Sequence, residues 1–171
     1  MMKRLILLVI SVVSLSAMAQ QTKTIQWHIE DMHCGNCARR ISTALEHLTG
    51  VDSLDFNLDK HTFTVKYDAN KTNRDNIRQA INSLGYTPVT YYDQDIVAYL
   101  YFILPEGSIS NSIIGKAMEI EGVADANIST KNHSLAISYD TTEITDDKLV
   151  EELKSRDIKV EIPKPHECQE K

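Results

Sequence analysis

Two cysteines near the start of the chain have the clearest chemical potential. They stand in Met32-His33-Cys34-Gly35-Asn36-Cys37, with two residues between the sulfurs. Thiolates are soft donors that select Cu(I), Hg(II), Zn(II) or Cd(II) over Mg²⁺ and Ca²⁺. Two thiolates satisfy a linear ion such as Cu(I) or Hg(II), whereas structural zinc takes about four ligands. The motif therefore predicts a soft-metal site at Cys34 and Cys37.

A few other side chains are candidate auxiliary ligands. We expect His33 to face solvent, but as a ligand it would favour Zn(II). Near the end of the chain, His166 and Cys168 form a second candidate pair, and Cys168 can instead be a free thiol or join two chains. The remaining histidines are scattered, so we expect them to be surface or hydrogen-bonded residues: His28, His47, His61 and His133.

A C-x-x-C pair can also perform thiol–disulfide exchange. That reading needs the motif to open a longer parallel βαβ fold, and the pattern around Cys34 is too short for it. The sequence contains no phosphate-binding loop, no arrangement of Ser, His and Asp that we can place, and no paired carboxylates at a credible site. We therefore do not expect an enzyme.

The first nineteen residues have the pattern of a secretory signal peptide. Lys3-Arg4 precede an apolar run from Leu5 to Leu15, and Ala17-Met18-Ala19 place small residues before Gln20. The apolar run is short for a membrane span of roughly 20 residues. The pattern predicts removal of residues 1–19, export to a periplasm or the medium, and no membrane insertion of what remains.

Composition and charge exclude several other classes. The chain has 171 residues, 42% hydrophobic and 25% charged, which is typical of a globular protein. Its net charge is −6 and becomes more negative without Lys3 and Arg4, which argues against nucleic acid as a partner. Three cysteines, an odd number, exclude a scaffold of several disulfides.

The chain also repeats itself. A shift of 72 positions superposes Gly50-Val51 on Gly122-Val123, His61 on His133 and Tyr67-Asp68 on Tyr139-Asp140, and we expect no gap. The repeat predicts two small domains, at residues 20–90 and 96–163, followed by a flexible tail at 164–171. Two units joined by so short a segment are expected to touch, with Tyr91-Tyr92 packed between them.

Each unit reads as strand, helix, strand, strand, helix, strand. In the first, Ile25, Trp27 and Ile29 alternate, whereas Ile41 and Leu45 have helical spacing. Two later strands and a second helix follow, with Thr72 and Asp75 as a predicted capping pair and Gly85 as the helix end. This order predicts a ferredoxin-like α+β fold in both units, each a four-stranded antiparallel sheet with both helices on one face.

The predicted elements place the cysteines between the first strand and the first helix. Unpaired backbone N–H groups and the helix dipole favour negative charge there. Such surroundings lower the pKa of a thiol and favour its thiolate form.

The first unit resembles the heavy-metal-associated domain. The resemblance rests on Met32-His33-Cys34-Gly35-Asn36-Cys37, on Gly50-Val51 and on Leu84-Gly85-Tyr86, and covers about Thr24 to Val89. It implies that Met32 packs under the loop that contains Cys34 and Cys37, here called the metal loop. It also implies that Tyr86 supports the site, as in bacterial copper chaperones. This favours Cu(I), with Hg(II), Zn(II) and Cd(II) as alternatives. Asp31 departs from the family, which usually has Gly there.

The second unit looks like a degenerate copy without cysteines. The 72-residue shift maps Met32 to Leu104, Cys34 to Glu106 and Cys37 to Ile109. We therefore expect a carrier that captures a soft metal ion in its first unit and transfers it to a protein partner, such as a metal-transport ATPase or an efflux component. A mercury scavenger, a zinc or cadmium binder that recruits His33 or Asp31, and a metal-sensing interaction module stay open.

Overall fold

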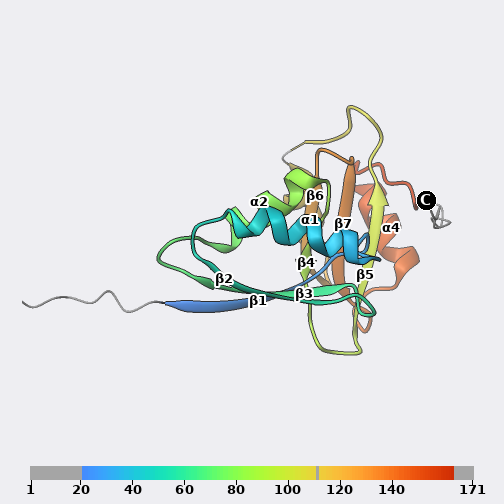
Figure 1. Cartoon of the computed structure of the whole chain (residues 1–171). Helices are drawn as coiled ribbons and strands as arrows, with labels where there is room; N and C mark the ends of the chain where they lie inside the picture. The colour runs from blue at the N-terminus through green and yellow to red at the C-terminus, as the bar shows by residue number, and fades with distance from the viewer. Residues whose placement is uncertain (1–20, 111, 164–171) are drawn as a thin grey trace, which may run out of the picture.

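The computed structural model describes residues 21–110 and 112–163, which form two α+β units (Figure 1). The predicted signal peptide at 1–19 and the predicted tail at 164–171, with His166 and Cys168, lie outside these residues. The first unit consists of β1 (Thr22–His28), α1 (Gly35–Glu46), β2 (Val51–Asn57), β3 (Thr62–Asp68), α2 (Arg74–Leu84) and β4 (Val89–Thr90).

The first unit has the predicted ferredoxin-like arrangement. Its four strands lie in the order β2-β3-β1-β4, and each neighbouring pair is antiparallel. Helices α1 and α2 lie side by side on one face of this sheet (Figure 1). The core between the layers contains the predicted strand and helix positions, because alternate strand residues and every third or fourth helix residue point inward: Trp27, Ile29, Ile41, Leu45, Phe63, Val65, Ile77 and Ile81.

The second unit repeats the fold with shorter helices. It consists of β5 (Val97–Ile103), α3 (Ser112–Met118), β6 (Val123–Ser129), β7 (Ser134–Asp140) and α4 (Asp146–Ser155). Its sheet has the order β5-β7-β6 and is again antiparallel. Both units are therefore α+β, as predicted.

The second sheet differs from the prediction in its last strand. Four strands were expected, but the described residues form three, and the fourth position is a single bridge between Ile103 and Glu161. The two residues exchange both backbone hydrogen bonds, at 2.8 and 2.9 Å. Pro163 follows two residues later and has no N–H to donate, so pairing cannot continue in the same way.

The repeat also contains a gap that the sequence comparison missed. In the first sheet Trp27 pairs with Phe63, and in the second Phe102 pairs with Leu135. Phe63 and Leu135 are 72 positions apart, whereas Trp27 and Phe102 are 75 apart. Since the buried helix residues Ile41 and Ile113 return to the 72-residue spacing, the second unit is three residues shorter between its first strand and first helix. The predicted equivalence of Met32 with Leu104 is therefore wrong, and Leu104 corresponds to Ile29.

One helix start differs from the predicted capping pair of Thr72 and Asp75. Asn73 is the N-cap of α2, and its side chain accepts a hydrogen bond from the backbone N–H of Asn76 at 2.9 Å. The Thr72 hydroxyl is buried and has no partner among the described residues. The predicted end is confirmed, because Gly85 has a left-handed φ of 103° that suits glycine.

The two units pack closely against each other. A bulge between Val123 and Asp125 shifts the alternation of β6, so that Asp125, Asn127 and Ser129 point away from their own core. All three side chains are buried, because the first unit covers this face of the second sheet, while α4 lies on the other face (Figure 1).

Polar contacts join the units. Asp125 accepts hydrogen bonds from Arg74, Arg78 and Thr90, and Asn82 and Asn127 exchange two side-chain hydrogen bonds of 2.9 and 3.1 Å. Tyr91 stacks on Tyr99, and the Tyr92 N–H donates to the Tyr99 hydroxyl, as expected for an interdomain pair.

Among the described residues, no helix combines the length and apolar character needed to cross a bilayer.

Candidate metal site

The two cysteines lie together where β1 leads into α1. Cys34 is the N-cap residue of α1 and is exposed, whereas Cys37 lies in the first turn and is half-buried. Their Sγ atoms are 3.2 Å apart and both thiols are free. Two sulfurs bound to one ion at about 2.3 Å each cannot be more than about 4.6 Å apart. The two sulfurs are therefore close enough to bind one ion, and a linear ion requires them to move apart by about 1.4 Å.

The surroundings of Cys34 favour its thiolate. The hydrogen bond with the Cys37 side chain is the largest cause that lowers the pKa of Cys34, and backbone N–H groups of Cys37 and Asn36 add to it. These N–H groups face the sulfur, although it makes no capping hydrogen bond with α1. Orphan N–H groups at a helix start stabilise negative charge, so the helix itself prepares a donor for a cation.

Met32 and Tyr86 are the two residues that were predicted to support the cysteines. Met32 is fully buried in the core of the first unit, which excludes it from contact with solvent. Tyr86 follows α2, and burial together with a hydrogen bond to Cys37 raises its pKa to about 12. The Arg40 guanidinium lies 5.6 Å from the centre of the Tyr86 ring. Tyr86 thus has both the Arg40 guanidinium and the Cys37 side chain beside it.

The second unit borders the site on one side. An open pocket of about 590 Å³ lies between the units next to the metal loop. The first unit contributes Asp31, His33, Arg40 and Tyr86 to its lining, and the second contributes Tyr101 and Lys131. Burial raises the pKa of Tyr101 to about 12, and the neighbouring Asp31 also raises it. Asp31, where the family usually has Gly, therefore faces the second unit.

Of the auxiliary candidates, His33 is the one within the described residues. His33 is exposed, and its ring packs edge-on against the His61 ring with 4.9 Å between the centroids. His166 and Cys168 lie outside the described residues. His33 therefore contacts a group of side chains that does not include the two cysteines.

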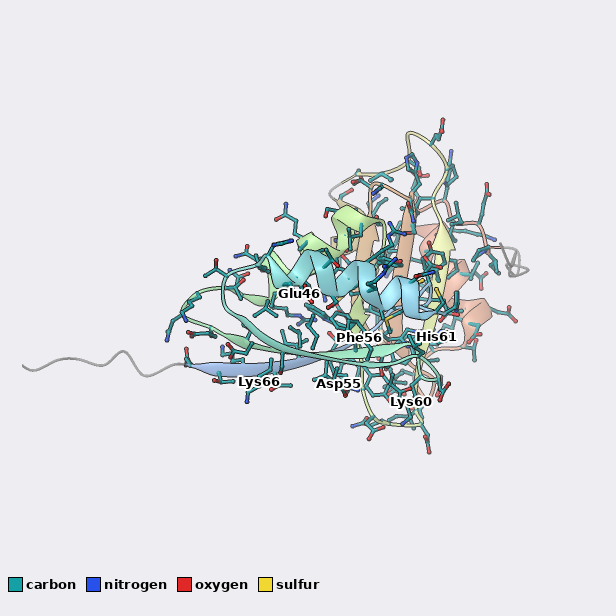
Figure 2. The ribbon with its side chains drawn as sticks, viewed as in Figure 1. Glu46, Asp55, Phe56, Lys60, His61 and Lys66 are labelled. Carbon is teal, nitrogen blue, oxygen red and sulfur yellow. The ribbon has the colours of Figure 1, made fainter. Side chains whose placement is uncertain are left out.

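That group was missed by sequence reasoning. His28, Glu30 and His61 each offer a ligand atom, and these atoms lie within 4.8 Å of one another. Figure 2 labels His61 at the end of the first unit where α1 begins. The i, i+2 spacing of His28, which ends β1, and Glu30 in the turn that follows was a usable signal. Nothing in the sequence indicated that the turn before β3 would bring His61 beside them.

Fold and loop together define a class of metal-binding domain. The heavy-metal-associated domain matches residues 27–87, which include the cysteine loop, both helices and the two long strands β2 and β3. This chain also covers most of the length of the two copper chaperones described below, and it belongs to the heavy-metal-associated domain family.

Curated relatives match either the first unit or both. The copper chaperone CopZ of Staphylococcus haemolyticus is 36% identical over 59 residues, which are 34% of this chain and 87% of the chaperone. CopZ of Staphylococcus aureus strain JH9 is 36% identical over 62 residues, which are 91% of its length. The copper-exporting P-type ATPase of Bacillus subtilis is 29% identical over 143 residues, which are 83% of this chain but 17% of the ATPase.

Solved structures of the same family resemble the chain as well. The N-terminal soluble domains of Bacillus subtilis CopA cover 84% of this chain and 95% of their own, with 25% identity and a TM-score of 0.38. Oxidized MerP from Ralstonia metallidurans CH34 covers 42% of this chain and 99% of its own, with 22% identity and a TM-score of 0.39.

Proposed function

We propose that this protein is a carrier, not a catalyst, that captures Cu(I) through Cys34 and Cys37 and hands it to a protein acceptor. The observation that carries this proposal is the pair of free sulfurs 3.2 Å apart at the exposed start of α1. A two-coordinate soft ion needs no further ligand. Similarity over most of the length of the copper chaperones supports copper as the cargo.

The charges near the loop suit such an ion. Cu(I) bound by two thiolates carries a net negative charge, which the Arg40 guanidinium and the positive end of α1 offset. Since Met32 is buried in the core, the cysteines are free to exchange ligands while the base of the loop stays in place.

Handover would proceed by ligand exchange. An incoming acceptor thiolate binds the ion and forms a three-coordinate intermediate. One site cysteine then dissociates, and the ion stays bound to the acceptor thiolate and to the other cysteine. The exposed position of Cys34 and the open pocket beside the loop give the acceptor access. The acceptor we propose is a metal-transport ATPase or an efflux component, in line with the similarity of 83% of this chain to part of a copper-exporting ATPase.

Metal analysis of the reduced, anaerobically prepared protein tests the cargo. We expect one equivalent of Cu(I) in competition with a chromophoric Cu(I) chelator, and its loss in the Cys34→Ser/Cys37→Ser variant. A Cys168→Ser variant is the matched control and should keep the full equivalent. The cargo assignment fails if the double variant retains Cu(I), or if Hg(II) or Zn(II) displaces Cu(I) at equal concentration.

We also propose that the carrier works outside the cytoplasm, with residues 1–19 removed. The support is the sequence pattern of a charged start, an apolar run and small residues before Gln20. Fractionation of expressing bacteria, followed by sequencing of the N-terminus, tests this directly. We expect a mature chain that begins at Gln20, and an intact chain in the cytoplasm would overturn the assignment.

A further inference from the structure

We propose that His28, Glu30 and His61 form a second metal site, separate from the cysteine pair, for a borderline divalent cation of the Zn(II) or Cu(II) type. Two imidazoles and one carboxylate suit such ions, whereas two thiolates suit a softer one. The two sites would therefore differ in the chemistry of the ions that they take.

The spacing of the ligand atoms supports the site. His28 Nε2 lies 3.0 Å from Glu30 Oε2, and His61 Nδ1 lies 3.9 Å from the same oxygen. Ligand atoms about 2.0–2.1 Å from a tetrahedral ion are about 3.3 Å apart. The two distances bracket this value, and all three ligand atoms lie within 4.8 Å of one another, so side-chain adjustment can bring them around one ion.

The backbone fixes the three residues relative to one another. His28 ends β1, and Glu30 lies two positions later in the turn that follows, where its carboxylate contacts the His28 ring. The Ile29 N–H donates to the His61 carbonyl at 2.8 Å, which holds the turn against this segment. His61 has a left-handed φ of 51°, a backbone conformation uncommon for a residue other than glycine.

Neighbouring groups hold the rings in place. The His28 side chain is 11% exposed, and its ring stacks on Tyr99 of the second unit with 4.1 Å between centroids. Its Nδ1 has no hydrogen-bond partner among the described residues, so the ring is held by stacking and by Glu30. His33 packs edge-on against His61 and is a candidate for a fourth ligand.

The second unit provides a natural comparison. His133 occupies the same turn position as His61 and has nearly the same φ, 50°. By the strand pairing, however, Ile103 and Pro105 take the places of His28 and Glu30 there. His133 thus shares the backbone conformation of His61 without the two other ligands.

Zn(II) titration of a protein with Cys34, Cys37 and Cys168 replaced by Ser tests the proposal. Removal of all thiols separates this site from the Cu(I) site, so failure of one proposal leaves the other standing. We expect one equivalent of Zn(II) by calorimetry. His61→Asn should weaken binding at least about tenfold, because Asn tolerates the left-handed conformation but removes the imidazole.

His133→Asn is the matched control and should leave Zn(II) affinity unchanged, while circular dichroism verifies that both variants fold. In a Cu(II) arm, electron paramagnetic resonance should show nitrogen couplings from imidazole that decrease in His61→Asn. Three results would overturn the proposal: no Zn(II) binding by the thiol-free protein, equal losses in the two Asn variants, or a Cu(II) signal without nitrogen couplings.

Discussion

At the scale of single residues, the metal loop combines exposed donors with a buried anchor. Cys34 is exposed and Met32 is fully buried, although one residue separates them. A donor on a rigid base can exchange ligands without loss of position. The burial of Met32 is compatible with the packing role that the family resemblance implied, and its removal should affect stability first.

The first prediction concerns this anchor. Met32→Ala should lower the free energy of unfolding by about 2–5 kcal/mol, because it leaves a cavity in the core of the first unit. Urea unfolding of the metal-free protein measures the change. Met118→Ala is the matched control, since Met118 is 43% exposed and its truncation should cost under about 0.5 kcal/mol. Equal effects of the two changes would contradict the anchoring role.

At the scale of elements, each helix start has a separate task. The start of α1 leaves its N–H groups for the cysteine sulfurs, whereas the start of α2 is closed by the Asn73 side chain. α4 is closed in the same manner by Thr145, whose hydroxyl accepts from Lys148. The helix at whose start we propose an ion binds thus lacks the side-chain cap that α2 and α4 have.

The second prediction tests which residue caps α2. Asn73→Ala should cost about 1 kcal/mol of stability, because the N–H of Asn76 loses its acceptor. Thr72→Val is the matched comparison and should be neutral or stabilising, since the buried Thr72 hydroxyl has no partner among the described residues. Thermal unfolding of both variants decides the question. A larger loss for Thr72→Val would restore Thr72 as the cap.

At the scale of the whole molecule, the second unit packs against the first. One face of the second sheet lies against the first unit. The second unit also lines part of the pocket beside the metal loop, and its Tyr99 stacks on His28. The three-residue gap lies in the segment that corresponds to the metal loop. The copy has therefore lost the length as well as the cysteines of that loop, which fits a supporting role.

The third prediction concerns the joint between the units. Asp125→Ala should destabilise the protein by on the order of 3 kcal/mol, because Arg78, 17% exposed, and the Thr90 N–H both lose their acceptor. Unfolding should also become broader as the units uncouple. Asp55→Ala on an exposed part of β2 is the control and should resemble the parent protein. A sharp transition with unchanged midpoint in Asp125→Ala would show that the joint contributes little.

Local patterns in the sequence predicted much of this molecule. Alternating and helical spacing located the strands and helices, because each pattern depends on which side of one element faces the core. The cysteine motif and its place before a helix were equally local. Gly85 as a helix end was predictable from the conformation that only glycine adopts easily.

Only the tertiary structure decided how distant segments meet. The gap in the repeat became visible through strand pairing, since a shift of three residues between elements leaves each element's own pattern intact. The cluster of His28, Glu30 and His61 depends on a hydrogen bond between the end of β1 and the turn before β3. The burial of Asp125 depends on the other unit. Contacts between segments far apart in the chain follow from packing, which the spacing of residues within one segment does not encode.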